Sequence, residues 1–454
     1  MALLADPRSG LAAFRGQVID RAHPEFELAR AVFNGAVDRR PTLIVRPLDA
    51  GDVQAAIQLA RTEGLPLSIR GGGHNVAGHA VCEDGMMIDL RLMRDVRVDV
   101  ASRSVEAGGG STWNDFDPAC QRHGLATPGG TFGTTGVGGL TLGGGLGHLM
   151  GQRGLTLDNL IGAEVVTAGG AVLLVDEHEH GDLFWALRGG GGNFGVVTRF
   201  VFRVHDVPQL VGGLLQYDFA RAGEIIRRVR ALLDGQPDEL TLFFVFVRDG
   251  PGGERRVLIS VCWTGSSEEA RSRLDELRSL PGLVHDGVRP LSYLQLQNSF
   301  GEIPFGFRHY WKGHFVRELP DDTIDFLVEH YARRSSPLGT VLIEPLQGYA
   351  TRVPEEATAF ANRGAAFNVS GIAAWQSADE DDAQKAWARE LADGVAPYSY
   401  RGGGYLNYMT RDEPLERVEA AFGAEKFARL REIKRRYDPD NLFRQNQNIP
   451  PADT

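Results

Sequence analysis

Apolar runs of strand length alternate with one amphipathic stretch in the first 206 residues. A helix is predicted over 50–63, where Val53, Ile57 and Ala60 recur at helical spacing. Residues 96–107 alternate between apolar and polar side chains, which predicts a hairpin. Short apolar runs predict further strands over 42–45, 66–69, 86–90, 163–167, 171–175 and 196–204.

Glycine becomes sparse in residues 207–400, where helical stretches alternate with strand-like runs in the manner of a second α+β domain. The C-terminal segment, 401–454, contains a strand predicted over 403–408 and a helix through 427–433, which ends at 437–441. The helices predicted in the second domain cover 223–233, 267–277, 323–334 and 381–393, and its predicted strands cover 240–247, 256–262, 340–347 and 367–375.

Composition excludes several classes of function. The chain has 454 residues, 43% hydrophobic and 24% charged, which is typical of a globular protein with two or three domains. A net charge of −11 argues against a nucleic-acid partner, and no apolar window is long enough for a membrane span. The three cysteines, Cys82, Cys120 and Cys262, are odd in number and widely spaced, which indicates reduced thiols and a cytoplasmic protein.

Two glycine-rich loops carry the candidate chemistry. Strand 66–69 runs into Arg70, three consecutive glycines, His74 and Asn75. Successive backbone N–H groups without side chains form a concave cradle for an anion such as a diphosphate. The second loop, 129–147, is about half glycine. Two such loops and one imidazole predict a large, phosphate-bearing cofactor held along its length, with no metal required.

Residues 190–195 match the G-x-G-x-x-G pattern of nicotinamide-cofactor folds. In those folds the glycine loop follows a strand and opens a helix. Here residues 182–187 before the loop have a helical pattern, and 196–204 after it have a strand pattern. Because the order is reversed, we reject a nicotinamide site.

Seven motifs along the chain occur together in one known family. They are Arg70–Asn75, Gly136–Leu140, Gly143–Gly147, Asp182–Gly189, Asn193–Val197, Tyr405–Tyr408 and the segment from Tyr437 to Pro450. In this order they resemble the berberine-bridge-enzyme-like FAD-linked oxidases of the vanillyl-alcohol-oxidase type, and the resemblance is greatest to compact bacterial members such as hydroxynicotine oxidases and natural-product oxidases.

This resemblance implies an α+β protein with a PCMH-type FAD-binding domain of two α/β subdomains. That domain is expected to comprise residues 1–206 together with 401–454, which return to it. Residues 207–400 are expected to form an α+β substrate-binding domain with an antiparallel sheet. A small-molecule substrate and molecular oxygen are the implied partners, and the protein is expected to be a monomer or a homodimer.

The resemblance places His74 at the histidine that is bonded to the flavin 8α carbon. A neutral imidazole is a competent nucleophile toward that carbon. Many relatives add a cysteinyl bond to the flavin, but Phe132 occupies that position, so a single link is expected. The other residues implied in cofactor binding are Ile69, Arg70, Gly71, Gly72, Gly73, Asn75, Gly129, Thr135, Gly136, Val137, Gly138, Gly139, Leu140, Leu146, Gly192, Val197, Asn407, Asn446 and Asn448.

Tyr408, Tyr405 and Thr135 are the candidate catalytic residues. Tyr408 is either an ordinary strand tyrosine or a general base. The second role requires a nearby cation or hydrogen-bond donors that stabilise the phenolate, and Arg411 or Lys312 could supply the charge. On a regular strand, Tyr408 would face away from Tyr405 and Asn407.

Thr135 falls at the position that controls oxygen access in relatives, and its size is close to that of valine. This favours an oxidase that transfers a hydride to flavin N5 and then reduces oxygen to hydrogen peroxide.

The alternatives are a dehydrogenase with another electron acceptor and a flavin-containing protein that binds a drug. The tyrosine pair favours an alcohol or phenol over an amine as substrate, and the substrate itself stays open. Residues 308–312 and 344–349 have the aromatic and polar composition of a ligand-binding wall, although a core strand with a solvated face would have the same pattern.

Overall fold

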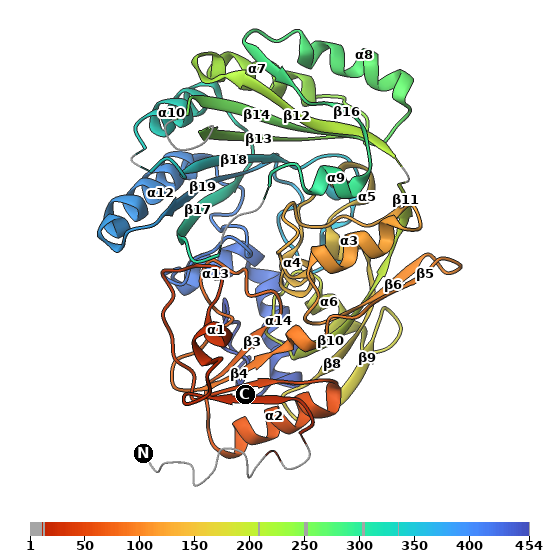
Figure 1. Cartoon of the computed structure of the whole chain (residues 1–454), viewed down its shortest axis with the longest axis vertical. Helices are drawn as coiled ribbons and strands as arrows, with labels where there is room; N and C mark the ends of the chain where they lie inside the picture. Colours follow the sequence, from red (N-terminus) through yellow and green to blue (C-terminus); the bar gives the residue numbers. More distant parts are fainter. Residues whose placement is uncertain are drawn as a thin grey trace.

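The computed structural model describes Leu11 and residues 14–207, 209–248, 253–301, 305–334 and 336–453. Helices and sheets are mixed along this part of the chain, which confirms the predicted α+β class. Figure 1 shows two smaller sheets in the lower half of the molecule and one large sheet in the upper half. Within the described residues, no helix is long and apolar enough to cross a membrane.

The first sheet is built from the N-terminal residues and leads directly into the first glycine loop. Its strand order is β1-β2-β4-β3, with β4 parallel to both β2 and β3. Helix α2 packs against it through Val53, Ala56, Ile57 and Ala60. The elements are β1 (Gln17–Asp20), β2 (Leu43–Arg46), α2 (Ala50–Thr62), β3 (Leu67–Arg70) and β4 (Met86–Asp89).

The second sheet is antiparallel, with the order β5-β6-β10-β8-β9. Its core includes side chains of the C-terminal helices α13 and α14, so the end of the chain packs against its first half. The elements are β5 (Val96–Asp99), β6 (Ser104–Gly108), β8 (Leu160–Val166), β9 (Val172–Val175), α6 (Gly181–Leu187), β10 (Val196–Arg203), α13 (Leu415–Phe422) and α14 (Ala424–Tyr437). Helix α6 before the 190–195 glycines and strand β10 after them confirm the reversed order.

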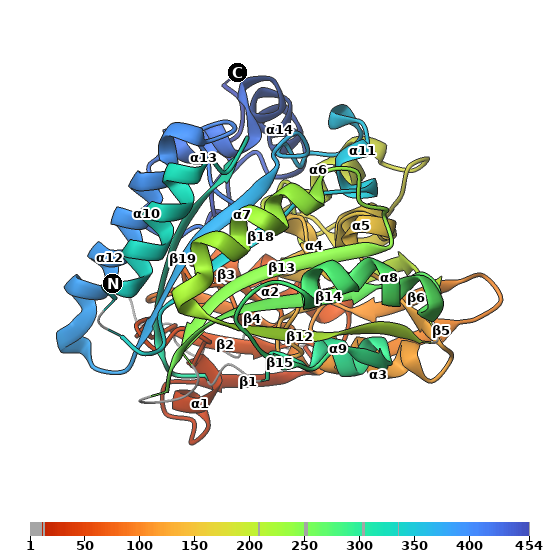
Figure 2. The same ribbon diagram turned by 90° about the horizontal axis from the view of Figure 1, so that it is seen from above.

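The third sheet is antiparallel and has eight strands, with β15-β12-β14-β13-β18-β19-β17 in order and β16 paired with β12. Helices α7, α8, α10 and α12 cover its outer face (Figures 1 and 2). The strands are β12 (Leu210–Asp218), β13 (Leu240–Arg248), β14 (Arg255–Trp263), β15 (Leu283–Asp286), β16 (Arg289–Leu291), β17 (Arg308–Val316), β18 (Thr340–Pro345) and β19 (Phe367–Trp375). The helices are α7 (Ala222–Leu233), α8 (Ser267–Arg278), α10 (Asp321–Ala332) and α12 (Asp381–Val395).

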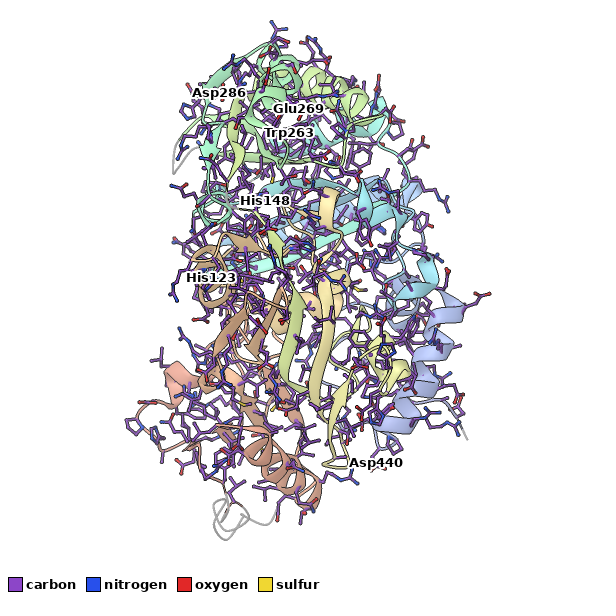
Figure 3. All side chains as sticks on the ribbon, turned by 90° about the vertical axis from the view of Figure 1, so that its right-hand side faces the viewer. His123, His148, Trp263, Glu269, Asp286 and Asp440 are labelled. Atoms are coloured by element: carbon purple, nitrogen blue, oxygen red, sulfur yellow. The ribbon has the colours of Figure 1, made fainter. Side chains whose placement is uncertain are left out.

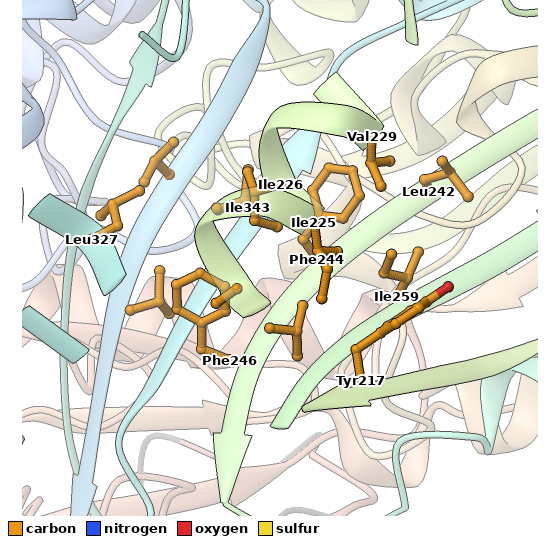
Figure 4. Packing of buried hydrophobic residues seen from close by; sticks show 14 of the residues in the cluster. Tyr217, Ile225, Ile226, Val229, Leu242, Phe244, Phe246, Ile259, Leu327 and Ile343 are labelled. Carbon is orange, nitrogen blue, oxygen red and sulfur yellow. The ribbon is translucent and has the colours of Figure 1, made fainter. Parts of the chain in front are cut away.

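Side chains point alternately to the two faces of this sheet, and the two faces have different surroundings. On β13 and β18, Phe244, Phe246 and Ile343 pack under the helices in the cluster of Figure 4. Their neighbours Val245 and Leu342 point to the opposite face. One face therefore forms a core, and the other is available to form the wall of a site.

A buried polar network joins the large sheet to the rest of the molecule. His148, labelled in Figure 3 between the two ends of the molecule, lies 2.9 Å from Gln297 Oε1 and 3.0 Å from Ser260 Oγ on β14. Gln297 also donates to the Gly130 carbonyl at 2.7 Å. Short elements fill this junction and the edges of the fold. They are α1 (Phe26–Arg30), α3 (Trp113–Gln121), β7 (Leu125–Ala126), α5 (Met150–Arg153), β11 (His205–Asp206), α9 (Tyr293–Gln297) and α11 (Tyr349–Arg352).

Two local predictions are wrong. The strand predicted over 403–408 is a turn, in which the Tyr408 N–H donates to the Tyr405 carbonyl at 2.8 Å. Part of the second glycine loop is instead helix α4 (Val137–Gly143). Glycine is a poor helix former, but buried Val137 and the close packing of Gly138 on the Phe200 ring hold this turn of helix in place.

Because the two faces of β18 differ in burial, substitutions of equal size on them should lower the free energy of unfolding by different amounts. Ile343→Ala removes a fully buried side chain beneath the helices and should lower the free energy of unfolding by about 2–5 kcal/mol. Leu342→Ala removes the same number of atoms from the partly accessible opposite face, and the loss should be about 1 kcal/mol. Urea denaturation followed by circular dichroism measures both, and equal losses would contradict this assignment of faces.

Candidate active site

A cavity of about 600 Å³ lies between the glycine loops and the inner face of the large sheet. That volume is in the range of cofactor and substrate sites. The cavity brings together most of the site residues predicted from the sequence. Those that line it are Ile69, Gly71, Gly72, Gly73, His74, Asn75, Thr135, Gly136, Gly138, Gly139, Leu140, Leu146, Gly192, Val197, Tyr405, Asn407, Tyr408 and Asn446.

Four predicted cofactor residues do not line the cavity, for reasons that packing makes clear. The Arg70 guanidinium turns away and donates to the Ala29 carbonyl at 2.8 Å. Val137 belongs to the apolar core of the second sheet. Gly129 lies against the Trp113 ring, and Asn448 lies outside the lining. Arg70, Val137 and Gly129 thus pack behind the loops rather than facing the cavity.

The glycines of the two loops leave room that any side chain would fill. A Cβ atom on Gly72 would lie 2.4 Å from the Gly136 nitrogen, and one on Gly136 would lie equally close to the Gly72 nitrogen. The loops can therefore meet only as bare backbone. Gly139 and Gly192 line the cavity, and a Cβ atom there would meet no protein atom within 4 Å. This open space suits a ligand that approaches the backbone closely.

His74 stands at the end of the first glycine loop and is partly accessible. Its ring stacks on Phe33, with centroids 4.0 Å apart and planes 14° apart, and its Nε2 atom has no hydrogen-bond partner. The surrounding protein desolvates the ring and lowers its pKa to about 4. The imidazole is therefore neutral at physiological pH, as a nucleophile or a ligand-binding group requires.

Phe33 also connects the first glycine loop to the large sheet. It stacks on His309 of β17, with ring centroids 4.4 Å apart. The adjacent Asn34 donates to the Val76 carbonyl at 2.6 Å and the His309 carbonyl at 2.9 Å. This pair of contacts fixes His74 relative to the sheet across the cavity.

Glu344 is a functional candidate that the sequence identified only as part of a possible wall. It is 4% exposed, lies on the cavity face of β18 and faces Asn368 across the strand pair. Asn368 donates to Glu344 Oε2 at 2.6 Å, and the Tyr408 hydroxyl donates to Oε1 at 3.3 Å. Burial raises the carboxyl pKa to about 7. A lone carboxylate in an apolar strand was the available signal, since buried carboxylates are rare.

The turn at 405–408 directs Tyr405, Asn407 and Tyr408 into the cavity together, which removes the expected conflict over strand faces. The Tyr405 hydroxyl accepts from the Gly145 N–H at 2.8 Å and from Asn407 Nδ2 at 2.9 Å. The rings of Tyr405 and Tyr408 meet edge to face at 4.7 Å.

No cation among the described residues activates Tyr408. Of the two predicted partners, Lys312 forms an ion pair with Glu413 (Nζ to Oε1, 2.5 Å) and Arg411 is exposed. The Tyr408 hydroxyl donates to the Glu344 carboxylate instead, and burial and this carboxylate raise the Tyr408 pKa well above 10. The described contacts therefore stabilise the protonated phenol rather than a phenolate.

The predicted wall residues divide according to strand alternation. His309 and Trp311 on β17 line the cavity, whereas Tyr310 and Lys312 do not. Tyr310 turns outward and its hydroxyl donates to Asp412 at 2.8 Å. Among the described residues 344–349, Glu344 is the one that lines the cavity.

Phe132 lines the cavity, and its ring lies 6.1 Å from that of Phe300. Cys82, Cys120 and Cys262 are buried elsewhere and do not contribute to the described lining. Burial raises the pKa of all three thiols, so each is held in its unreactive protonated form.

The C-terminal tail closes one side of the cavity and is fixed by a buried ion pair. Lys434 Nζ lies 2.6 Å from Asp438 Oδ2, and both side chains are fully buried. Lys434 also donates to the carbonyls of Asn193 and Phe443, which ties the 190–195 glycine loop to the tail. Asn446 in that tail donates to the Gly192 carbonyl at 3.0 Å.

Two family models match the chain at these elements. One, described as an FAD binding domain, matches residues 41–176 and includes both glycine loops. The other, described as berberine and berberine like, matches residues 404–450 and includes the tyrosine turn and the tail.

Known proteins are similar over nearly the whole chain. (R)-6-hydroxynicotine oxidase of Paenarthrobacter nicotinovorans is 32% identical over 99% of this chain and 98% of its own length. An FAD-linked oxidoreductase of Dictyostelium discoideum is 29% identical over 92% of this chain and 91% of its own length.

Among solved structures, 6-hydroxy-D-nicotine oxidase of Arthrobacter nicotinovorans superimposes with a TM-score of 0.89 at 29% identity, covering 99% of this chain and 100% of that chain. The fold is therefore that of the PCMH-type flavoproteins. On the strength of these matches, the chain belongs to the berberine-bridge-enzyme-like family and is an FAD-linked oxidoreductase.

Proposed function

We propose that this enzyme is an oxidase that holds FAD through a single covalent bond to His74 and oxidises a small organic molecule with oxygen as electron acceptor. The observation that carries the proposal is that the neutral imidazole of His74 and the buried carboxylate of Glu344 line one cavity. The imidazole is suited to hold the cofactor, and the carboxylate is suited to take a proton from the substrate.

The residues present fit FAD. The bare backbone of Gly71–Gly73 and Gly136, together with the open space at Gly139 and Gly192, offers N–H groups and room for a diphosphate-containing molecule. His74 keeps a nitrogen lone pair for a bond to the 8α carbon. Phe132 and the absence of a cysteine in the described lining support one bond rather than two.

When bound, FAD accepts a hydride from the substrate, and its electrons then reduce dioxygen to hydrogen peroxide. Loss of a hydride from an alcohol, phenol or amine is accompanied by loss of a proton from oxygen or nitrogen, and Glu344 accepts that proton. Its pKa near 7 matches the working pH, which is the condition for an efficient general base.

Tyr408 and Asn368 position Glu344 rather than replace it. Each donates one hydrogen bond to the carboxylate, and together they orient it toward the cavity. The raised pKa of Tyr408 keeps the phenol protonated, which suits a donor and opposes a role as the base. Tyr405, held by the Gly145 N–H, supports Tyr408 from the side.

Thr135 supports oxygen as the acceptor. It lies within the second glycine loop and lines the cavity, and its side chain is no larger than that of valine. A small side chain there leaves a path for dioxygen, whereas a longer one would block it.

Turnover should depend on an ionised Glu344. Below pH 7 the carboxyl gains a proton, so kcat/KM should fall about tenfold for each further pH unit. Glu344→Gln should lower kcat by about 10²- to 10⁴-fold while the protein keeps its flavin. The measurement is a pH profile of peroxide release with a substrate found by panel screening.

Tyr408→Phe is the matched control for this assignment. Because the Tyr408 hydroxyl lowers the pKa of Glu344, its loss should move the pH profile upward and reduce kcat by roughly tenfold. The assignment would be wrong if Tyr408→Phe lowered kcat as much as Glu344→Gln does and left the pH profile of the remaining activity unchanged. That result would identify Tyr408 as the base.

Oxygen reactivity gives a second test, which needs no substrate. Enzyme reduced anaerobically with dithionite and mixed with aerated buffer should reoxidise within seconds and release peroxide. Thr135→Leu should slow this step by at least about tenfold, whereas Thr135→Val should leave it unchanged. Slow reoxidation of the wild type together with rapid electron transfer to an artificial dye would identify a dehydrogenase instead.

A further inference from the structure

The inner face of the large sheet forms an aliphatic wall on the substrate side of the cavity. Strands β13, β14, β18 and β19 each present alternate side chains to it. Besides Thr340 and Glu344 of β18, which are polar, these side chains are aliphatic, and they are Val245, Val247, Leu258, Leu342, Ile372 and Ala374. A substrate seated against this wall gains from apolar contact and loses the hydration of any polar group that faces it.

The polar side chains that the large sheet places in the cavity are Thr340, Glu344, His309 and Trp311, and Glu344 is the one carboxylate among these sheet residues. Each of its carboxylate oxygens receives one hydrogen bond, from Asn368 or Tyr408, and each can accept another. Within the described residues, no lysine or arginine forms an ion pair with Glu344. The carboxylate therefore has free acceptor capacity and no internal cation.

Aromatic rings pack around Tyr408, which donates to this acceptor. Trp311 meets Tyr408 edge to face with ring centroids 5.2 Å apart, and Tyr408 meets Tyr405 in the same manner. All three rings line the cavity and offer a flat ring aromatic contacts. The burial of Glu344 also strengthens a hydrogen bond to its carboxylate, because the local dielectric is low.

From this arrangement we propose that the substrate is a lipophilic, ring-containing molecule that presents one hydrogen-bond donor, O–H or N–H, to Glu344. The inference rests on the proposed function and narrows its substrate class. A sugar is a poor fit, because nearly every carbon carries a hydroxyl and the aliphatic wall would leave several of them without partners. A neutral hydroxyl and an ammonium group can each donate this hydrogen bond, and the binding experiment below distinguishes between them.

Binding to the flavin-loaded protein tests this proposal without turnover. The probes are naphthalene, 2-naphthol, 2-naphthylmethylamine and cellobiose, titrated anaerobically and followed by the change in flavin absorption. At least one donor-bearing naphthalene should bind about tenfold or more tightly than naphthalene, and cellobiose should show no saturation. Tighter binding of 2-naphthol would indicate that the site selects a hydroxyl donor, and tighter binding of 2-naphthylmethylamine would indicate an ammonium donor.

Two variants separate the donor contact from the aliphatic wall. Glu344→Gln should reduce the advantage of the donor-bearing probe to less than about threefold while naphthalene affinity stays the same. Val245→Thr, which has the same shape, should weaken naphthalene binding by about three- to tenfold. The second variant tests the wall even when the first folds poorly.

The proposal is overturned when cellobiose binds as tightly as the naphthalene probes, or when Glu344→Gln leaves the donor advantage intact. Neither result would bear on the oxidase assignment, since binding is measured in the absence of oxygen and the assignment concerns the reaction with oxygen. Conversely, a slow reaction with oxygen would remove the oxidase assignment and leave the substrate class untouched.

Discussion

The site depends on the close approach of two stretches of bare backbone. Gly72 and Gly136 come so near that a Cβ atom on either would lie 2.4 Å from the other's nitrogen. This contact joins the loop after β3 to the start of α4 and sets the floor of the cavity. His74 follows directly on the Gly71–Gly73 run, and Thr135 directly precedes Gly136. The cofactor site therefore exists only because no side chain occupies these positions.

The large sheet supplies the opposite wall through simple alternation. Along β18, Val341 and Ile343 build the core beneath the helices, while Leu342 and Glu344 face the cavity. A well-packed core thus holds the carboxylate in place, and the pairing of Glu344 with Asn368 gives it a fixed orientation. The strand that stabilises the fold is also the strand that positions the proposed proton acceptor.

Local patterns predicted the two glycine loops and most helices and strands, because these are local features, whereas the family resemblance supplied the PCMH-type fold and most of the site residues. The loop with His74 was identifiable from consecutive glycines alone. The role of Glu344 was not, because its burial depends on the register of β18 with β19 and on a turn far along the chain. The turn at 405–408 resembled a strand, since Tyr405 and Tyr408 are frequent strand residues. Arg70 looked like an anion ligand, but its side chain bonds the Ala29 carbonyl.

The central claim is a single bond between His74 and the flavin. Trypsin should release residues 71–91 as one peptide, because Arg70 and Arg91 flank it and no Lys or Arg lies between them. Mass spectrometry of the flavin-loaded protein should find this peptide heavier by the flavin group, with fragmentation placing the addition on His74 rather than His79. An unmodified peptide from fully loaded protein, or a flavin on another residue, would contradict the account.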